Sequence, residues 1–440
     1  MKTRTAAASI LISLPPGGYN YESATDRFIQ ANSFSQPDRD FIYLLVKGVI
    51  QYQRLLDFII DQARKKKRSH IENIARALLR IGVFQIVILN IPAHAAVHET
   101  VAAARQINRH DLTDYINAVL RHLPEEGVWR ENLRQLDPAV ALAIEYSHPE
   151  WLVKKWLANF GRESTVALLG FDNNYQEIYF RHNPLRGTWA EFEKLLQERA
   201  FQVEPYATEP ICFFKVDRPG DLLKSDFFRE GRCSVQDFSQ SLAVRLLDPL
   251  AGETILDACA APGGKATYIA QITQNRAHVQ ANDRTPHKIE LVKESACRLG
   301  IDSLYYSMSD ASIAKFPTVD KALVDAPCTG TGILARRADL RWNRRPEELI
   351  RARAIQAGIL NNVAAAVRDQ GFLVYSTCSL EYEENWTTVT EFIDCHPEFS
   401  VEPADKYVDS CYCDEKGAVR ILPFIHNLTG SFAVRLKKIS

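Results

Sequence analysis

The chain has 440 residues, of which 46% are hydrophobic and 24% are charged, and its formal net charge is −1. This composition is typical of folded proteins with a sizeable core, and the length indicates about three domains at roughly 150 residues each. The near-zero net charge excludes binding of a polyanion through overall charge, so a nucleic-acid partner would have to bind local basic patches.

Residues 1–140 are predicted to be all-helical. Apolar residues recur at helical spacing across 41–50, 55–60 and 71–89, and a further short helix is expected at 111–123. No apolar run approaches the about 20 residues needed to cross a membrane. The apolar stretch 6–14 weakly resembles a secretion signal but lacks a small-residue cleavage site, so export is not expected.

Residues 145–245 are predicted to form a small α+β domain, which we interpret as a linker or RNA-binding domain. Trp151 to Phe160 reads as an amphipathic helix, and 177–180 and 212–216 read as short strands. Prolines and Gly220 separate these elements.

From residue 246 to 440, short apolar strands alternate with longer helices. Strands are predicted at 254–259, 278–283, 303–308, 321–325 and 371–377, and helices are clearest at 285–299 and 346–368. This alternation predicts an α/β fold with a parallel sheet covered by helices on both faces. Two late strands, at 419–424 and 432–436, are expected to form an antiparallel hairpin at one sheet edge.

The most informative motif runs from Leu256 to Lys265, where the first of these strands ends and a helix begins. Gly263 and Gly264 allow a ligand to approach the backbone, and the helix N-terminus offers unpaired N–H groups to a carboxylate or phosphate. A glycine turn alone can be a simple tight turn. The GxGxxG spacing of dinucleotide sites is absent. The strand before the turn and the helix after it favour a ligand site.

Two aspartates follow the next strands. Asp283 lies about 20 residues past the glycine turn, where a carboxylate can bind ribose hydroxyls, although a helix cap is the alternative. Asp310 could accept a hydrogen bond from an adenine amino group, and a cap or turn role is equally consistent with its spacing.

Asp325, Cys328 and Cys378 follow the last two parallel strands. Ligands of open parallel sheets bind at the carboxyl ends of the strands, so these side chains should converge over one crevice. A lone cysteine is usually a small core residue, but this set indicates chemistry. A thiolate that adds to C6 of cytosine makes C5 nucleophilic toward a methyl group, and a carboxyl group near N3 assists. A second thiolate can remove the C5 proton before the first is eliminated.

These motifs resemble the RNA cytosine-C5 methyltransferases, most closely the bacterial ribosomal RNA enzymes of the RsmB (Sun/Fmu) group. The resemblance implies a Rossmann-like class I fold that uses S-adenosylmethionine. It implies that Cys378 is the nucleophile, that Cys328 promotes product release and that Asp325 assists. The residues implied to hold the cofactor are Cys259, Ala260, Ala261, Pro262, Gly263, Gly264, Lys265, Asp283, Asp310 and Asp325.

The N-terminal third resembles the NusB-like domain of the same group, through residues 79–85 and 94–101. This combination implies 16S ribosomal RNA, or an early small-subunit particle, as the partner. Two departures from the family bear on the RNA contacts. Ala338 stands where a proline is usual before Asp339, and residues 428–432 replace an aspartate–glycine–aromatic run.

Basic stretches supply candidate RNA contacts. Residues 64–68 could neutralise phosphates or form a solvated loop. The arginines between 336 and 345, with Trp342 among them, are predicted to contact the RNA backbone and stack on a base. Gln236 and Asp237 could line the crevice or cap a helix.

The nine cysteines are spread along the chain, which argues for reduced thiols and a cytoplasmic protein. Cys395, His396, Cys411 and Cys413 lack the usual zinc spacing, so no metal is expected. Three alternatives stay open. These are the same chemistry on transfer RNA, a non-catalytic RNA-binding assembly factor, and a DNA cytosine methyltransferase in which Cys328 would be the nucleophile.

Overall fold

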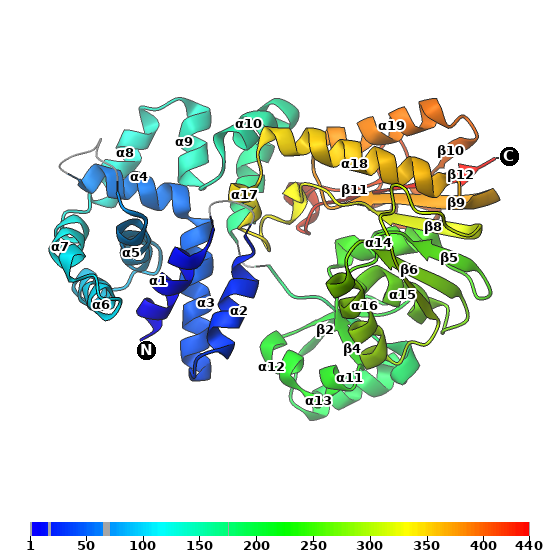
Figure 1. Ribbon diagram of the computed structural model, residues 1–440, viewed down its shortest axis with the longest axis horizontal. Helices are drawn as coiled ribbons and strands as arrows, with labels where there is room; N and C mark the ends of the chain where they lie inside the picture. The colour runs from blue at the N-terminus through cyan, green and yellow to red at the C-terminus, as the bar shows by residue number, and fades with distance from the viewer. Residues whose placement is uncertain (1, 16–18, 65–70, 175, 440) are drawn as a thin grey trace. The chain divides into compact units, whose positions relative to one another are not determined.

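The computed structural model describes residues 2–15, 19–64, 71–174 and 176–439. The chain forms two compact units (Figure 1). One comprises Met1–Asn174 together with Leu334–Arg344, and the other comprises Tyr175–Ile333 together with Arg345–Ser440. The first unit is therefore completed by a short segment from much later in the sequence.

The first unit is helical, as the sequence predicted for residues 1–140. Ala6, Ala7 and Ala8 have no exposed surface, so the apolar stretch 6–14 belongs to the folded core. Phe84–Ile88 forms a π-helix that continues α5. The α-helices are α1 (Thr3–Ser13), α2 (Tyr21–Gln30), α3 (Gln36–Gln51), α4 (Gln53–Ala63), α5 (Asn73–Val83), α6 (Ala93–Gln106), α7 (Thr113–Arg121), α8 (Glu126–Arg134), α9 (Pro138–Glu145), α10 (Glu150–Asn173) and α17 (Leu340–Asn343).

The second unit begins with a four-stranded antiparallel sheet in the order β2-β3-β1-β4. Its strands are β1 (Phe180–His182), β2 (Val203–Ala207), β3 (Phe213–Val216) and β4 (Cys233–Val235), with helices α11 (Trp189–Glu198), α12 (Pro219–Lys224) and α13 (Asp226–Arg229). The α+β prediction is confirmed. The strand predicted at 177–180 lies at Phe180–His182. Strands β2 and β4 were not predicted, because they are short and their apolar and polar residues do not alternate regularly.

The larger sheet has the order β10-β12-β9-β8-β5-β6-β7, with β11 paired to β12. Its strands are β5 (Thr254–Asp257), β6 (His278–Asp283), β7 (Leu304–Met308), β8 (Val319–Asp325), β9 (Val367–Thr377), β10 (Phe399–Glu402), β11 (Val419–Ile421) and β12 (Ser431–Lys438). From β5 the chain moves to β6 and β7, then returns to the other side of β5 with β8. In open parallel sheets, ligands bind at the carboxyl ends of the strands where the strand order reverses, which here is between β5 and β8.

Helices cover both faces of this sheet, as predicted. Ile255 and Leu323 pack against residues of α14 (Phe238–Leu247), α15 (Gly264–Ile272) and α16 (Pro286–Leu299). The next residue of each strand, Leu256 and Val324, packs with α18 (Pro346–Ala364) and α19 (Trp386–Cys395). Consecutive strand residues point to opposite faces, so one short apolar strand supplies two cores.

Three details differ from the predictions. The sheet is mixed, because β12 runs antiparallel to both β9 and β10. The predicted late hairpin exists between β11 and β12, but β12 lies inside the sheet and Phe424 belongs to helix α20 (Pro423–His426). Helix α18 ends at Ala364, before the predicted limit of residue 368, and strand β9 begins at Val367, before the predicted limit of residue 371.

Candidate active site

The glycine turn connects β5 to α15. Gly263 has a φ of +108°, and a Cβ there would lie 3.3 Å from the Cα of Val292 in α16. A side chain at this position would therefore be strained and crowded. Since the turn opens a nine-residue helix at the topological reversal, its N–H groups face the place where an anionic or polar ligand would bind.

Asp283, at the end of β6, bridges to this turn. Its carboxylate accepts from the backbone N–H of Ala261 at 3.2 Å and of Arg284 at 2.7 Å, and Lys288 lies 3.4 Å away. Asp310 accepts from the N–H and hydroxyl of Ser312 at 3.0 and 2.6 Å, which is a turn-capping role. The Asp310 side chain is 34% exposed and remains accessible to a ligand.

Asp257 ends β5 beneath the glycine turn and is fully buried. Neither carboxylate oxygen makes a hydrogen bond of ordinary geometry. Burial, followed by the negative charge of Asp325, raises its pKa to about 7. The positive charge of Lys265, and then the nearby N–H of Cys259, offset only part of this shift. A buried carboxyl without full hydrogen bonding is costly, and such groups concentrate at functional sites.

Asp325, at the end of β8, is held from two sides. It accepts from the ammonium of Lys265 at 2.6 Å and from the hydroxyl of Ser376 at 2.9 Å. Burial alone would lower the pKa of Lys265, but Asp325, and then Asp257, raise it above its ordinary value. Lys265 therefore stays charged and fixes the orientation of Asp325. The sequence reading did not single out Ser376.

The two thiols predicted to share a crevice lie together. The Sγ atoms of Cys328 and Cys378 are 3.1 Å apart, in the segments that follow β8 and β9. The hydrogen bond with Cys378, then burial and the charge of Cys378, raise the pKa of the Cys328 thiol well above its ordinary value. The Cys328 thiol is therefore favoured in its protonated state.

Arg181, in β1, is a supporting residue that the sequence reading missed. Its buried guanidinium donates to the carbonyl of Gly264 at 2.9 Å and also binds Gln236. Gln236 itself donates to the carbonyl of Gly264 at 3.3 Å, whereas Asp237 caps α14. Gln236 thus supports the glycine turn, and the capping alternative holds for Asp237. A charged residue beside a predicted strand was the available signal for Arg181.

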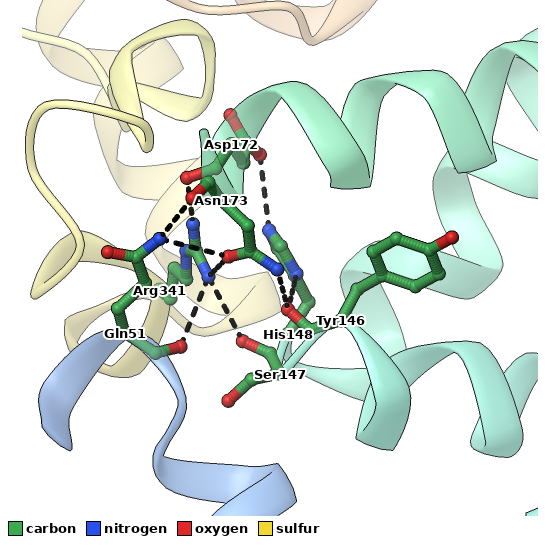
Figure 2. A network of polar contacts seen from close by, with 7 residues as sticks. All are labelled: Gln51, Tyr146, Ser147, His148, Asp172, Asn173 and Arg341. Carbon is green, nitrogen blue, oxygen red and sulfur yellow. Dashed lines mark hydrogen bonds and ion pairs between the residues drawn. The ribbon is translucent and has the colours of Figure 1, made fainter. Parts of the chain in front are cut away.

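The RNA prediction for the arginine-rich segment is wrong for Arg341. Figure 2 shows the guanidinium of Arg341 enclosed by acceptors of the helical unit, and 1% of the residue is exposed. The acceptors are the carbonyls of Gln51 (3.2 Å), Ser147 (3.3 Å) and Asp172 (2.6 Å) and the amide oxygen of Asn173 (2.7 Å). The Trp342 indole donates to the carbonyl of Ile50 at 2.7 Å.

Other predicted RNA contacts have different outcomes. Ala338 is buried in the helical core, so its departure from the family pattern concerns packing. Of the basic cluster 64–68, Arg64 pairs with Asp61 at 2.9 Å, and residues 65–68 lie outside the described residues. Within the described ranges no helix is long and apolar enough to span a membrane, and no group of three or more potential ligands could hold a metal.

Comparison with known proteins assigns each part of the chain. A family model described as 16S rRNA methyltransferase RsmB/F matches residues 244–437. Models of the NusB family and of an RsmF/B-like ferredoxin-like domain match residues 1–125 and 148–219. A Bacillus subtilis protein named probable ribosomal RNA small subunit methyltransferase B is 33% identical over 423 residues, which are 93% of each chain. The chain belongs to the RsmB/F family of 16S rRNA methyltransferases.

Further comparisons agree with this family. A Synechocystis protein with the same printed name is 31% identical over 422 residues, 94% of each chain. Among solved structures, PH0851 has a TM-score of 0.81 at 24% identity and covers 100% of this chain and 99% of its own. NSun6 from Pyrococcus horikoshii with SFG has a TM-score of 0.60 at 21% identity and covers 66% and 98%. The predicted family and the NusB-like, α+β and methyltransferase fold classes are confirmed.

Proposed function

We propose that this protein transfers a methyl group from S-adenosylmethionine to C5 of a cytosine in 16S ribosomal RNA through a covalent bond between Cys378 and C6. The observation that carries the proposal is the pair of thiols 3.1 Å apart after β8 and β9. A single buried cysteine would be an ordinary core residue, whereas two thiols in contact at the ligand end of a parallel sheet suit nucleophilic chemistry.

The residues after β5, β6 and β7 fit S-adenosylmethionine. The turn at residues 259–265 offers backbone N–H groups and a surface without side chains, and Asp283 and Asp310 offer carboxylates for ribose hydroxyls and the adenine amino group. Asp257 has unused acceptor capacity beneath the same turn. When bound, the cofactor supplies an electrophilic methyl group.

On the other side of the crevice, Cys378 adds as a thiolate to C6, which makes C5 nucleophilic. Asp325, whose carboxylate Lys265 and Ser376 hold, would assist by accepting a hydrogen bond from N3 once N3 is protonated during addition to C6. A base in a structured RNA must be exposed or flipped to reach these groups, so we expect a target in a loop or bulge.

Cys328 is suited to the release step. Its pKa is raised foremost by the hydrogen bond with Cys378. When Cys378 is bonded to C6, that acceptor and its charge are gone, so the Cys328 thiol ionises more easily. Once the Cys328 thiol has lost its own proton to solvent, its thiolate can remove the C5 proton. The C5–H electron pair then forms the C5–C6 double bond, and Cys378 leaves C6 as a thiolate.

The test is methylation of separated 16S rRNA and transfer RNA by the purified protein with labelled S-adenosylmethionine, followed by digestion to nucleosides. We expect label in 5-methylcytidine from 16S rRNA. Label in transfer RNA alone would contradict the proposed substrate, and label in another nucleoside would contradict the C5 chemistry. A protein that binds RNA but never transfers the label would instead be a non-catalytic assembly factor.

A further inference from the structure

Glu384 is a buried carboxylate outside the sequence motifs described above, and the proposed mechanism does not use it. It ends the short helix η5 (Tyr382–Glu384) and has no exposed surface. Four neutral groups donate to it. Its Oε1 accepts from the backbone N–H of Thr329 and from the amide of Gln356, each at 2.9 Å, and its Oε2 accepts from the hydroxyls of Thr329 and Ser379.

These donors come from the two segments that carry the thiols. Thr329 directly follows Cys328, and Ser379 directly follows Cys378. Gln356, in α18, also donates to the carbonyl of Pro327 at 3.0 Å, so the Cys328 segment is held on both sides of the thiol. We propose that Glu384 is a positioning residue that fixes the two thiols at reacting distance from each other.

The four hydrogen bonds to Glu384 require a carboxylate. Two ionised oxygens can accept all four hydrogen bonds, whereas a glutamine would present an NH₂ group toward donors. A buried charge is tolerated only when its acceptors are fully used, and hydrogen bonds to a charged group are the stronger kind. Glu384 can therefore hold the two segments more rigidly than a neutral side chain could.

The same charge bears on how the thiols share a proton. Three titratable groups interact with Cys328. They are Tyr375 in β9, Cys378 directly after β9, and Glu384 in η5. After the hydrogen bond with Cys378, burial and the charge of Cys378, the charge of Glu384 is a further cause that raises the pKa of Cys328. Glu384 therefore favours the protonated state of the Cys328 thiol.

The first test needs no RNA, so its outcome is independent of the proposed function. The full-length protein and E384Q are treated with iodoacetamide between pH 6 and 10, and modification of each cysteine is followed by mass spectrometry. In E384Q we expect Cys328 to react faster at pH 8 and its reactivity profile to move to lower pH, because a negative charge beside the thiol is removed. The matched control E391Q, at an exposed glutamate of α19 that pairs with Arg353, should leave both profiles unchanged.

The second test rests on the proposed function and uses turnover. In E384Q we expect kcat to fall roughly 10²-fold, with the KM for RNA and the affinity for S-adenosylmethionine unchanged, because misplaced reacting groups slow the chemical step. A folded E384Q whose melting temperature, thiol profiles and kcat all match the wild type would overturn the proposal.

Variants of the donors cover the case in which E384Q does not fold. T329V removes a donor on the Cys328 side, and S379A removes one on the Cys378 side. We expect T329V to alter mainly the alkylation of Cys328 and S379A mainly that of Cys378, whereas T390V, at an exposed threonine of α19, alters neither. If both donor variants leave both cysteines unchanged, Glu384 does not position the thiols.

Discussion

The two sides of the strand-end crevice are built differently. After β5, β6 and β7, carboxylates lie beside backbone N–H groups, and part of their hydrogen-bonding capacity is unused. The oxygens of Asp257 make no hydrogen bond of ordinary geometry, and the Asp310 side chain is 34% exposed. After β8 and β9, thiols, hydroxyls and the Glu384 carboxylate bind one another. Unused polar capacity suits a ligand that enters and leaves, whereas mutual hydrogen bonding suits groups that must stay in a fixed geometry.

Cys378→Ala is expected to have the largest effect and to separate the two sides. Turnover should fall at least about 10⁴-fold, because the addition that activates C5 is lost. The affinity for S-adenosylmethionine, measured by calorimetry, should stay at the wild-type value, because Cys378 belongs to the reacting side. Loss of cofactor binding in a folded variant would contradict the proposal that Cys378 acts on the base and does not hold the cofactor.

Cys328→Ala is expected to lower turnover by roughly 10²–10⁴-fold, the range for losing a general base. Unlike Cys378→Ala, it should accumulate a protein–RNA adduct that survives denaturation, visible as a slower band on a denaturing gel. If instead Cys378→Ala forms the adduct and Cys328→Ala forms none, the roles of the two thiols are reversed.

Asp257→Asn tests the buried carboxyl group on the ligand side through its effect on the free energy of unfolding. The folded-state pKa of Asp257, about 7, lies above the ordinary aspartate value of 3.8 that holds in the unfolded chain. Its contribution to stability is therefore present below about pH 4 and is lost as the pH rises through 7. Without bound ligand, the variant should be more stable than the wild type at pH 8 by roughly 2–4 kcal/mol, and similar at pH 4. Urea unfolding at several pH values measures this difference. The exposed aspartate variant D226N is the control, and a parallel pH profile for Asp257→Asn and wild type would refute the assignment.

Asp283→Asn and Asp310→Asn should have the smallest effects. Comparing them shows how much each aspartate on the ligand side contributes to cofactor affinity. Asp283 binds the glycine turn directly, so its variant should weaken cofactor binding roughly 10–100-fold. Asp310 is partly exposed and already caps a turn, so its variant should weaken binding only about threefold. Calorimetric titration gives both values, and a larger effect at Asp310 would invert this order.

The sequence was informative where one short segment determines the outcome. Strand β6 has the predicted limits, and Cys328 and Cys378 meet because each follows a parallel strand. It was less informative where partners lie far along the chain. Arg341 reads as a surface RNA contact because nothing near it in sequence reveals its acceptors in the helical unit. Glu384 stands in an acidic run that looks solvated, and only the folded chain brings its four donors together. The roles of the individual site residues stay predictions.

The buried guanidinium of Arg341 also constrains the order of folding during synthesis. It enters the chain 168 residues after Asn173, one of its acceptors. At about 5–20 residues per second, the helical unit would remain without this donor for roughly 10–30 s on the ribosome. Until then the carbonyls of Gln51, Ser147 and Asp172 need water or another donor. A fragment ending at residue 174 would keep that deficit permanently, and supplying residues 334–344 as a separate peptide should raise its melting temperature.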